Sequence, residues 1–294
     1  MPAKVKIGKL VVIGVGLIGG SFALALKKAR AVRHVVGVGR TRRNLALALG
    51  RGIVDEVVAD PGRAVRDADF VLVATPVGQM AEVMARIAPD LPPHAVITDG
   101  GSTKQDVIAH ARRCLGEHYV RFVPAHPIAG TETSGPAAAH PALYRGKSVI
   151  LTPQPETGAR ALRIARAVWQ QCGARVVRLD AREHDAIFAA VSHLPHVVAF
   201  ALVNALARRP DARKLFGFSG GGLRDTVRIA GSSPEMWRDI CLANREALLA
   251  ALEGYAAELG RVRAAIERGD GAALGAMFEN ARAARSRWLL GKRR

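Results

Sequence analysis

Residues 10–26 read LVVIGVGLIGGSFALAL, and this stretch decides the fold. Its first four residues are apolar and three of them are β-branched, which is typical of a buried strand. The glycines that follow, Gly14, Gly16 and Gly19, have the spacing GxGxxG, and a helical composition begins at Ser21. A strand, a glycine turn and a helix in this order are the context in which GxGxxG binds a dinucleotide.

Each glycine has its own role in such a turn. Gly14 permits the tight turn, Gly16 lets the backbone approach a pyrophosphate, and Gly19 lets the helix pack on the strand. Leu17 and Ile18 begin the helix, where unpaired amides meet the phosphates. The stretch is also uncharged and flanked by lysines, so a short membrane span or a signal segment is the alternative. We favour the buried strand and helix, and predict no membrane partner.

The second predicted strand, residues 34–39, carries the evidence on cofactor choice. A strand that binds NAD ends in an acid that holds the ribose hydroxyls. Here Gly39 stands in its place, and Arg40, Thr41, Arg42 and Arg43 follow. Arginine suits a 2′-phosphate because it makes paired, charge-assisted hydrogen bonds. We therefore predict NADP, with NAD as second choice; the alternative is a solvated basic helix start. Thr75 and Pro76, which end the third strand, are expected to line the same site.

The predicted secondary structure changes once along the rest of the chain, from alternating strands and helices to helices alone. Apolar strands alternate with helical stretches as far as residue 180, which predicts a parallel sheet covered on both faces. Beyond it, helical periodicity covers Ile187–Ala207, Met236–Leu259 and Ala272–Leu290. We predict an α/β protein: a Rossmann-type doubly wound parallel sheet over residues 1–180, then an all-helical domain over residues 181–294. The last segment would serve substrate binding and dimerisation.

Composition narrows the partners. The 294 residues carry a net charge of +18, which taken alone suggests nucleic acid. The basic residues are scattered, however, and aromatic residues rarely accompany them, as a stacking platform would require. The charge equally suits an anionic substrate and a phosphorylated cofactor. We predict a small-molecule substrate and no nucleic acid.

The cysteines and histidines show no metal-ligand spacing. Cys114, Cys172 and Cys241 lie far apart and form no CxxC pair, which suits buried thiols in a reducing compartment, hence the cytoplasm. His193 and His196 are three residues apart, but no third ligand is obviously placed for them. We predict no metal.

Five motifs carry a family resemblance. They are TDGGSTK (98–104), HPIAGTETSG (126–135), VSHLPH (191–196), GLRDTVRIA (222–230) and PEMW (234–237). Their order closely resembles prephenate and arogenate dehydrogenases over residues 8 to 260. The resemblance implies an oxidative decarboxylation that yields tyrosine or 4-hydroxyphenylpyruvate, in tyrosine biosynthesis, by a homodimer joined through the helical domain. One sequence leaves open whether prephenate, arogenate or both are used.

The resemblance also implies the catalytic residues. His126 would accept the proton of the substrate's ring hydroxyl, a role that suits imidazole because it titrates near neutral pH. Ser102 would touch the ring oxygen and orient His126; its plain alternative is a helix N-cap. Hydride leaves the same ring carbon for the nicotinamide, and carbon dioxide is lost as the ring becomes aromatic.

The substrate contacts follow in the same way. Arg228 would hold the side-chain carboxylate, because a tight pair with the departing carboxylate would stabilise the ground state. An ion pair with Asp225 is its alternative, and Asp225 is otherwise expected in an ion network at the site mouth. The remaining expected substrate contacts are His196, Thr131 and Glu132. His193 is expected in a supporting role, and Trp237 in a core or interface.

Two other functions stay open from sequence. A dehydrogenase of the hydroxyacid type would want a catalytic lysine in the helical domain, and residues 187–207 contain none. A non-catalytic Rossmann-type module that binds nucleic acid would show a steep salt dependence and no turnover.

Overall fold

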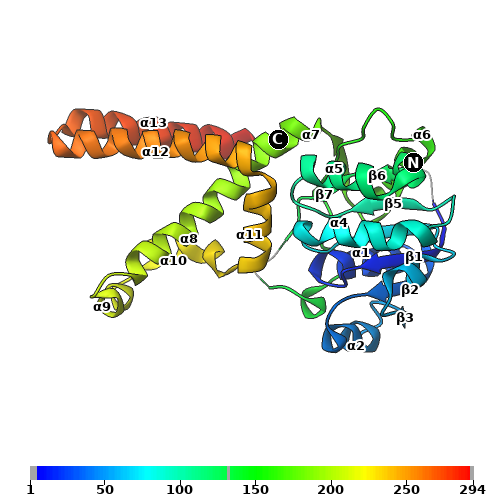
Figure 1. The fold of residues 1–294 in the computed structure, drawn as a ribbon. Helices are drawn as coiled ribbons and strands as arrows, with labels where there is room; N and C mark the ends of the chain where they lie inside the picture. Colours follow the sequence, from blue (N-terminus) through cyan, green and yellow to red (C-terminus); the bar gives the residue numbers. More distant parts are fainter. Residues whose placement is uncertain (1–4, 131–132, 292–294) are drawn as a thin grey trace. The chain divides into compact units, whose positions relative to one another are not determined.

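The computed structural model describes residues 5–130 and 133–291. By compactness the chain divides into two units, Met1–Arg245 and Glu246–Arg294. The first unit contains every strand of the described residues and the helices through α11, and the second contains α12 and α13 (Figure 1). Compactness therefore divides the chain further along than residue 180, and the domain boundary at 180 stays a prediction.

The main sheet has six parallel strands in the order β3-β2-β1-β4-β5-β6. They are β1 (Ile7–Ile13), β2 (Val32–Val38), β3 (Glu56–Val57), β4 (Phe70–Val73), β5 (Val96–Asp99) and β6 (Phe122–Val123). The order runs outward in both directions from β1 and β4, so the carboxyl ends of these two strands form the switch point where such sheets bind ligands. The predicted Rossmann-type sheet is confirmed.

Helices cover both faces of this sheet (Figure 1). They are α1 (Leu17–Lys28), α2 (Arg42–Gly50), α3 (Pro61–Val65), α4 (Val77–Ile87), α5 (Gln105–Cys114) and α6 (Ala159–Gln171). Alternate residues of β1 point to opposite faces. Leu10 and Val12 join one hydrophobic core, and Val11 and Ile13 join the other.

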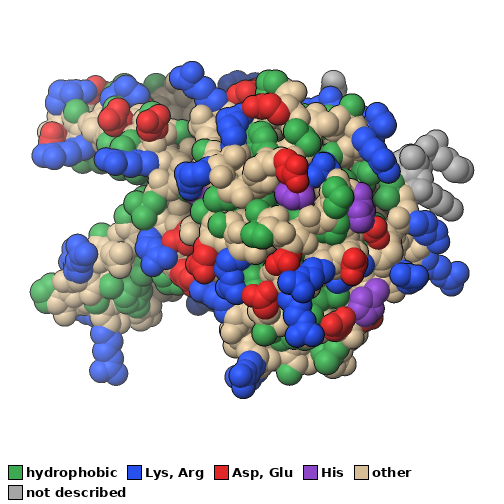
Figure 2. Space-filling model, turned by 45° about the vertical axis from the view of Figure 1, so that its right-hand side comes forward, with side chains coloured by type: hydrophobic (Ala, Val, Ile, Leu, Met, Phe, Trp, Pro, Cys, Tyr) green, Lys and Arg blue, Asp and Glu red, His purple; other side chains and the backbone are tan. Residues whose placement is uncertain are grey.

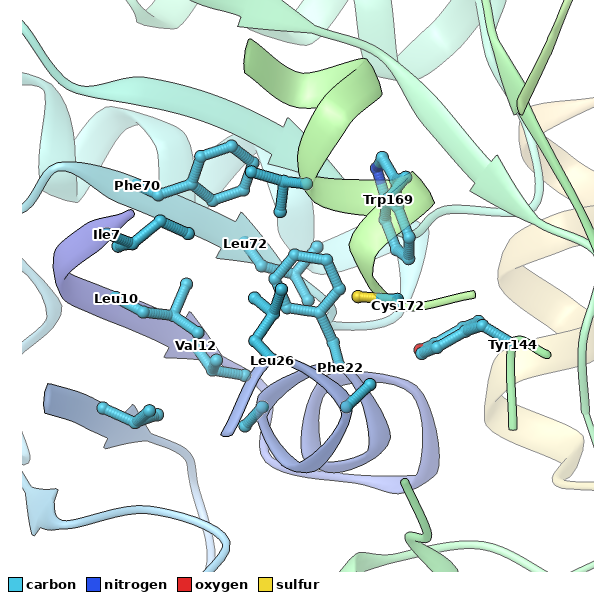
Figure 3. Packing of buried hydrophobic residues seen from close by; sticks show 14 of the residues in the cluster. Ile7, Leu10, Val12, Phe22, Leu26, Phe70, Leu72, Tyr144, Trp169 and Cys172 are labelled. Atoms are coloured by element: carbon cyan, nitrogen blue, oxygen red, sulfur yellow. The ribbon is translucent and has the colours of Figure 1, made fainter. Parts of the chain in front are cut away.

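The core on the α1 side is built around Phe22 (Figure 3). The Phe22 ring meets Trp169 of α6 edge to face at a centroid distance of 4.6 Å, and both side chains are fully buried. Aromatic pairs of this kind add about 1 kcal/mol to the free energy of burial. Residues 10–26 thus form a buried strand, a turn and a helix in the core, as predicted in preference to a membrane segment.

The last three predicted strands, over residues 121–125, 148–151 and 174–179, extend the main sheet only as far as β6; the rest forms a second sheet. This sheet has the order β7-β8-β9, with β7 (Ala125–Pro127) antiparallel to β8 (Ser148–Leu151) and β8 parallel to β9 (Arg175–Arg178). We expected residues 121–125 to be a single strand. Pro124 divides it because proline has no N–H to continue the ladder. The break carries His126 into the second sheet.

The helical region of the first unit begins with one long run. It comprises α7 (Ala181–Phe188), a π-helical turn (Ala189–His193) and α8 (Leu194–Ala207). By length and composition this run meets the criteria for a membrane span; its most apolar 18-residue window has a mean hydropathy of 1.9, and 22% of that window is buried. Two of its buried side chains, His184 and Asp185, are hydrogen-bonded to the sheet domain.

The remaining helices are α9 (Ala212–Gly217), α10 (Gly221–Val227), a 3₁₀ turn (Arg228–Gly231), α11 (Pro234–Ala243), α12 (Arg245–Glu267) and α13 (Gly271–Gly291). Ser233 caps α11 by accepting from the amide of Met236, as its sequence predicts. The predicted helix over residues 236–259 is wrong as a single element, because it ends at Asn244. The Asn244 side chain is buried and donates to the carbonyl oxygen of Asp185, which fixes the break.

Candidate active site

The glycine turn has the geometry that its spacing predicts. Gly14 has φ +97°, and a Cβ built on it would lie 2.5 Å from the carbonyl oxygen of Ala74. A Cβ on Gly19 would overlap the carbonyl oxygen of Gly14 and lie 2.6 Å from Val12. In contrast, no described atom lies within 4 Å of a Cβ built on Gly16. Gly14 and Gly19 are therefore required by close packing, and Gly16 faces open space.

Polar groups around this turn have room for a ligand. Helix α1 begins after Gly16 with no side-chain cap, so the amides at Leu17 and Ile18 start the helix uncovered by a polar side chain. The buried Thr75 hydroxyl, just beyond β4, has no hydrogen-bond partner among the described residues. Pro76 follows as the N-cap of α4. A helix amino end with an unpaired hydroxyl beside it fits the phosphates of a dinucleotide.

The arginines after β2 are exposed at the start of α2. Thr41 is the N-cap, and Arg42 and Arg43 occupy the first turn. Arg40 is paired with Glu235 of α11 at 3.2 Å, and Gln79 of α4 donates to the same carboxylate at 3.0 Å. The pair is solvent-exposed, with 67% of the Arg40 side chain accessible. Sequence reasoning missed Glu235 as a neighbour of these arginines.

The strand that carries His126 passes close to the glycine turn. A Cβ built on Gly100, just beyond β5, would lie 3.1 Å from Ile18 and 4.0 Å from Pro127. Pro127 follows His126 in β7, so the histidine strand and the phosphate turn flank the same strand end. The ring of His126 is half-buried and packs edge to face on Phe188 at 4.8 Å.

A chain of hydrogen bonds runs behind His126. Its Nδ1 lies 2.8 Å from Nε2 of His184, and Nδ1 of His184 lies 2.8 Å from Oδ1 of Asp185. The Asp185 carboxylate also accepts from the amides of Lys104 and Gln105 at the start of α5. His184 and Asp185 are fully buried.

A buried ion pair between Lys104 and Asp99 supports the backbone next to His126. The ammonium of Lys104 donates to Asp99 and, at 2.8 Å, to the carbonyl oxygen of Ala125. Asp99 in turn accepts from the amide of Ala125 at 2.8 Å. Ala125 is thus fixed from both sides immediately before His126. Sequence reasoning missed this group; the adjacent histidine and acid at 184–185, in the polar stretch REHD just before the apolar helical run, were the available signal.

Burial sets the protonation of these groups. It lowers the pKa of His126 well below 6.5, and the nearby His184, Lys104 and His193 lower it further. Burial lowers the pKa of His184 too, against the opposing hydrogen bond to Asp185. Burial raises the pKa of the Asp185 carboxyl, but hydrogen bonds from His184, Gln105 and Lys104 outweigh it and hold that pKa below its ordinary value. Near neutral pH both rings are neutral and Asp185 is ionised.

His193 and His196 occupy different environments. His193 is buried, its Nδ1 lies 3.1 Å from the Asn244 amide nitrogen, and its Nε2 has no partner among the described residues. Burial is the main cause that lowers its pKa to about 4. His196 stacks on Trp237 at a centroid distance of 3.6 Å, and its Nδ1 bonds to the carbonyl oxygen of Ser192. Trp237 belongs to a hydrophobic core, as predicted.

The other predicted residues are placed as follows. Ser102 is half-buried beside the end of β5, but it is not a helix cap, because α5 begins only at Gln105 with Lys104 in the capping position. Asp225 in α10 and Arg228 at the following 3₁₀ turn are exposed, and the positive charge of Arg228 contributes to lowering the pKa of His196. Thr131 and Glu132 lie outside the described residues.

The Nδ1 atoms of His193 and His196 are both hydrogen-bonded. Across residues 5–130 and 133–291, no group of three or more His, Cys, Asp or Glu side chains is placed to hold a metal ion. The three cysteines are free thiols; Cys172 is buried, and Cys114 and Cys241 are half-buried.

Basic side chains do not gather into one patch on the face that Figure 2 shows. Lys and Arg side chains are spread over it with acidic side chains among them. Several arginines are paired, such as Arg112 with Glu156 and Arg86 with Asp60. A continuous basic groove, which a nucleic-acid backbone requires, is not seen on this face.

Sequence comparison identifies both parts of the chain. Residues 22–178 match the nucleotide-binding domain of prephenate dehydrogenase, and residues 180–280 match its dimerization domain. The cyclohexadienyl dehydrogenase of Zymomonas mobilis is 38% identical over 280 residues, which cover 94% of each chain. The prephenate dehydrogenase of Bacillus subtilis is 35% identical, over 93% of this chain and 74% of its own.

Solved structures agree with the sequences. The prephenate dehydrogenase of Aquifex aeolicus, in complex with hydroxyphenyl propionate and NAD+, superposes with a TM-score of 0.89 at 35% identity, over 97% of this chain and 99% of its own. The arogenate dehydrogenase of Synechocystis superposes with a TM-score of 0.77 at 28% identity, over 95% of this chain and 99% of its own. Since both domain models match and the relatives align over nearly the whole chain, this protein belongs to the prephenate dehydrogenase family of oxidoreductases.

Proposed function

We propose that this chain catalyses the oxidative decarboxylation of prephenate or arogenate in tyrosine biosynthesis, with His126 as the base. One observation carries the proposal: on β7, whose Pro127 meets Gly100 near the glycine turn, His126 is a neutral imidazole with its Nδ1 hydrogen-bonded inside the protein. Its Nε2 remains as the group that accepts the ring hydroxyl proton. As the O–H bond breaks and the N–H bond forms, the oxygen's electron pair makes the ring carbonyl, and hydride would pass from that carbon to the bound cofactor. The ring carboxylate then leaves as carbon dioxide, its bonding electrons enter the ring, and the ring oxygen takes the proton back from His126 to give the phenol.

Residues around the turn would hold the cofactor. Gly14, Gly16, Leu17, Ile18 and Gly19 would cradle the pyrophosphate, and Thr75 and Pro76 would line the approach to the nicotinamide. When bound, the nicotinamide accepts the hydride, and the protein supplies position and one proton acceptor. The open space at Gly16 and the unpaired Thr75 hydroxyl support this fit.

The cofactor we propose is NADP, with NAD as second choice. Arg40, Arg42 and Arg43 lie exposed after β2, with Thr41 among them, and no acid ends that strand. The Aquifex aeolicus relative was solved with NAD+. Comparing kcat/KM for NADP and for NAD therefore tests the cofactor assignment of this chain directly.

The substrate's carboxylates would be held from the helical region. Arg228 would bind the side-chain carboxylate, and His196, stacked on Trp237, would contact the substrate from the facing helix. Ser102, beside the end of β5, would bond the ring oxygen. We assign Asp225, Thr131 and Glu132 to the rim of the site on the family pattern.

We also propose a cytoplasmic homodimer formed through the helical region. The matching family description is a dimerization domain, and α8 exposes much of its apolar surface. The free thiols suit a reducing compartment.

The decisive assay measures the absorbance of reduced nicotinamide with each substrate and each cofactor. We expect turnover with prephenate, arogenate or both, and a higher kcat/KM with NADP than with NAD. No reduction with either substrate would defeat the proposal, and a preference for NAD would defeat the cofactor assignment. Nucleic-acid binding with a steep salt dependence and no turnover would instead favour the non-catalytic alternative.

The assignment of Arg228 to the side-chain carboxylate has its own test. Replacement Arg228→Gln should raise KM by roughly 10- to 100-fold, since a charge-assisted pair contributes about 1.5–3 kcal/mol. Arg224→Gln, an exposed arginine one turn earlier in α10, is the matched control and should leave KM unchanged. Equal effects of the two replacements would remove the assignment of Arg228.

A further inference from the structure

The hydrogen bonds behind His126 have only one consistent direction. The ionised carboxylate of Asp185 can only accept, so Nδ1 of His184, 2.8 Å away, must carry a proton. A neutral imidazole has one N–H, which leaves Nε2 of His184 as an acceptor. Nδ1 of His126, 2.8 Å from that nitrogen, must therefore donate. The proton on His126 is thus on Nδ1, and Nε2 has a free lone pair.

This direction matters because both rings are neutral. Burial lowers the pKa of His126 and of His184, and the charged and titratable groups that act on them are Lys104, Asp99, Asp185 and His193. A neutral histidine can be a base only at the nitrogen that lacks the proton. In the other tautomer, Nε2 of His126 would carry a proton and could not accept the substrate's.

We propose that His184 and Asp185 are positioning residues that hold His126 in the Nδ1–H tautomer, so that Nε2 is the proton acceptor. The inference rests on the proposed function, since it concerns how the same base works. Neither residue needs to touch the substrate. When the hydroxyl proton arrives at Nε2, His126 becomes a cation whose Nδ1–H points along a chain that ends in the Asp185 carboxylate.

Lys104 fixes both ends of this chain. Its backbone amide donates to Asp185, and its ammonium holds the carbonyl oxygen of Ala125, next to His126. The strand that carries the base and the carboxylate that orients it are therefore tied to one residue. With Lys104 completely buried, this geometry is protected from competition by water.

Nitrogen NMR of the full chain labelled with ¹⁵N-histidine tests the tautomer directly. Long-range ¹H–¹⁵N correlations should show Nδ1–H for His126 and for His184. His193 provides the internal reference, because Asn244 donates to its Nδ1 and its proton must be on Nε2. A spectrum with His126 in the Nε2–H form would overturn the proposal.

Replacement Asp185→Asn tests the consequence. The amide can donate to Nδ1 of His184, which would reverse both rings and put the proton on Nε2 of His126. We expect kcat to fall by roughly 10²- to 10⁴-fold, no further than on removal of His126 itself, with KM nearly unchanged, as where a buried acid sets the tautomer of a histidine base. Both rings should appear as Nε2–H in the spectrum. A folded Asp185→Asn protein whose spectrum shows His126 in the Nε2–H form and whose kcat stays within about threefold would contradict the proposal.

A pair of replacements at His184 guards against a purely structural effect. In His184→Gln the side-chain oxygen can still accept from Nδ1 of His126, so kcat should fall less than about tenfold. His184→Leu has similar bulk and no acceptor, and should lose at least about 100-fold. Equal losses would overturn the proposal. Should the wild-type chain turn over neither substrate, the proposed function would fail, yet the wild-type spectrum would still decide the tautomer.

Discussion

The two sides of the candidate site are built on different principles. The nucleotide side is made of backbone shape: Gly14 and Gly19 allow close packing, and Gly16 leaves space. The proton side is made of hydrogen bonds between distant segments, which run from His126 through His184 to Asp185, where the Lys104 amide donates. The first side contains no titratable group that must stay neutral, whereas the second depends on buried neutral histidines. Mutations and acid should therefore damage the two sides in different ways.

The largest effect is expected from removing the base itself. Replacement His126→Asn should lower kcat by about 10²- to 10⁴-fold, the usual contribution of a positioned general base. The dissociation constant for the cofactor should change little, because the glycine turn is untouched. Stopped-flow or steady-state turnover and nucleotide titration measure the two quantities. His94→Asn is the matched control, since His94 is exposed before the amino end of β5, away from the site.

Near-normal turnover in His126→Asn would remove the base assignment. A loss of nucleotide affinity as large as the loss of kcat would show that the two sides are not separable in the way the geometry indicates.

Acid should lower the free energy of unfolding through the buried His193. The pKa of His193 is lowered from its ordinary 6.5 to about 4 in the folded chain. The unfolded chain therefore takes up a proton first, so the contribution is complete above pH 6.5 and is lost as the pH falls toward 4. A shift of this size corresponds to about 3 kcal/mol of the free energy of unfolding.

Urea unfolding at several pH values between 7 and 4 measures this loss. His193→Asn keeps an acceptor for the Asn244 amide and has no titrating ring, so its free energy of unfolding should fall by about 3 kcal/mol less over the same range. An identical pH dependence in the two proteins would show that His193 titrates normally in the folded state.

Two glycine-to-alanine replacements in the same turn test the nucleotide side, because each adds a single methyl group. Gly19→Ala should lower the free energy of unfolding by about 1–3 kcal/mol, because the added methyl meets backbone that cannot move away. Gly16→Ala should change it by less than about 0.5 kcal/mol, since the methyl points into open space. In that space it would instead weaken cofactor binding. Denaturation curves and nucleotide titration distinguish these outcomes, and a stable Gly19→Ala protein would contradict the packing argument.

The same contrast explains why the nucleotide side could be predicted from the sequence and the partners of His126 could not. The turn at Gly14–Gly19 was predictable because its signal is local: a strand, three glycines and a helix in sequence order. The parallel sheet followed from the same alternation, but the break at Pro124, which moves His126 into a second sheet, did not. His126 itself was found through its motif. Its partner His184 lies 58 residues further along the chain, beside Asp185 in the polar stretch REHD, and only the tertiary fold brings the two to the base.

Arg40, after β2 on the nucleotide side, carries the smallest expected effect on catalysis. Its pair with Glu235 is exposed, and exposed pairs contribute little free energy, so a 2′-phosphate can displace the carboxylate. If Arg40 binds that phosphate, Arg40→Ala should reduce the ratio of kcat/KM for NADP over NAD by about tenfold.

Glu235→Gln removes the competing charge beside Arg40, so the same ratio should rise by roughly two- to fivefold. A ratio that moved in the same direction in both variants would mean that Glu235 holds Arg40 in its binding position instead of competing for it, and an unchanged ratio in Arg40→Ala would assign the phosphate to Arg42 or Arg43.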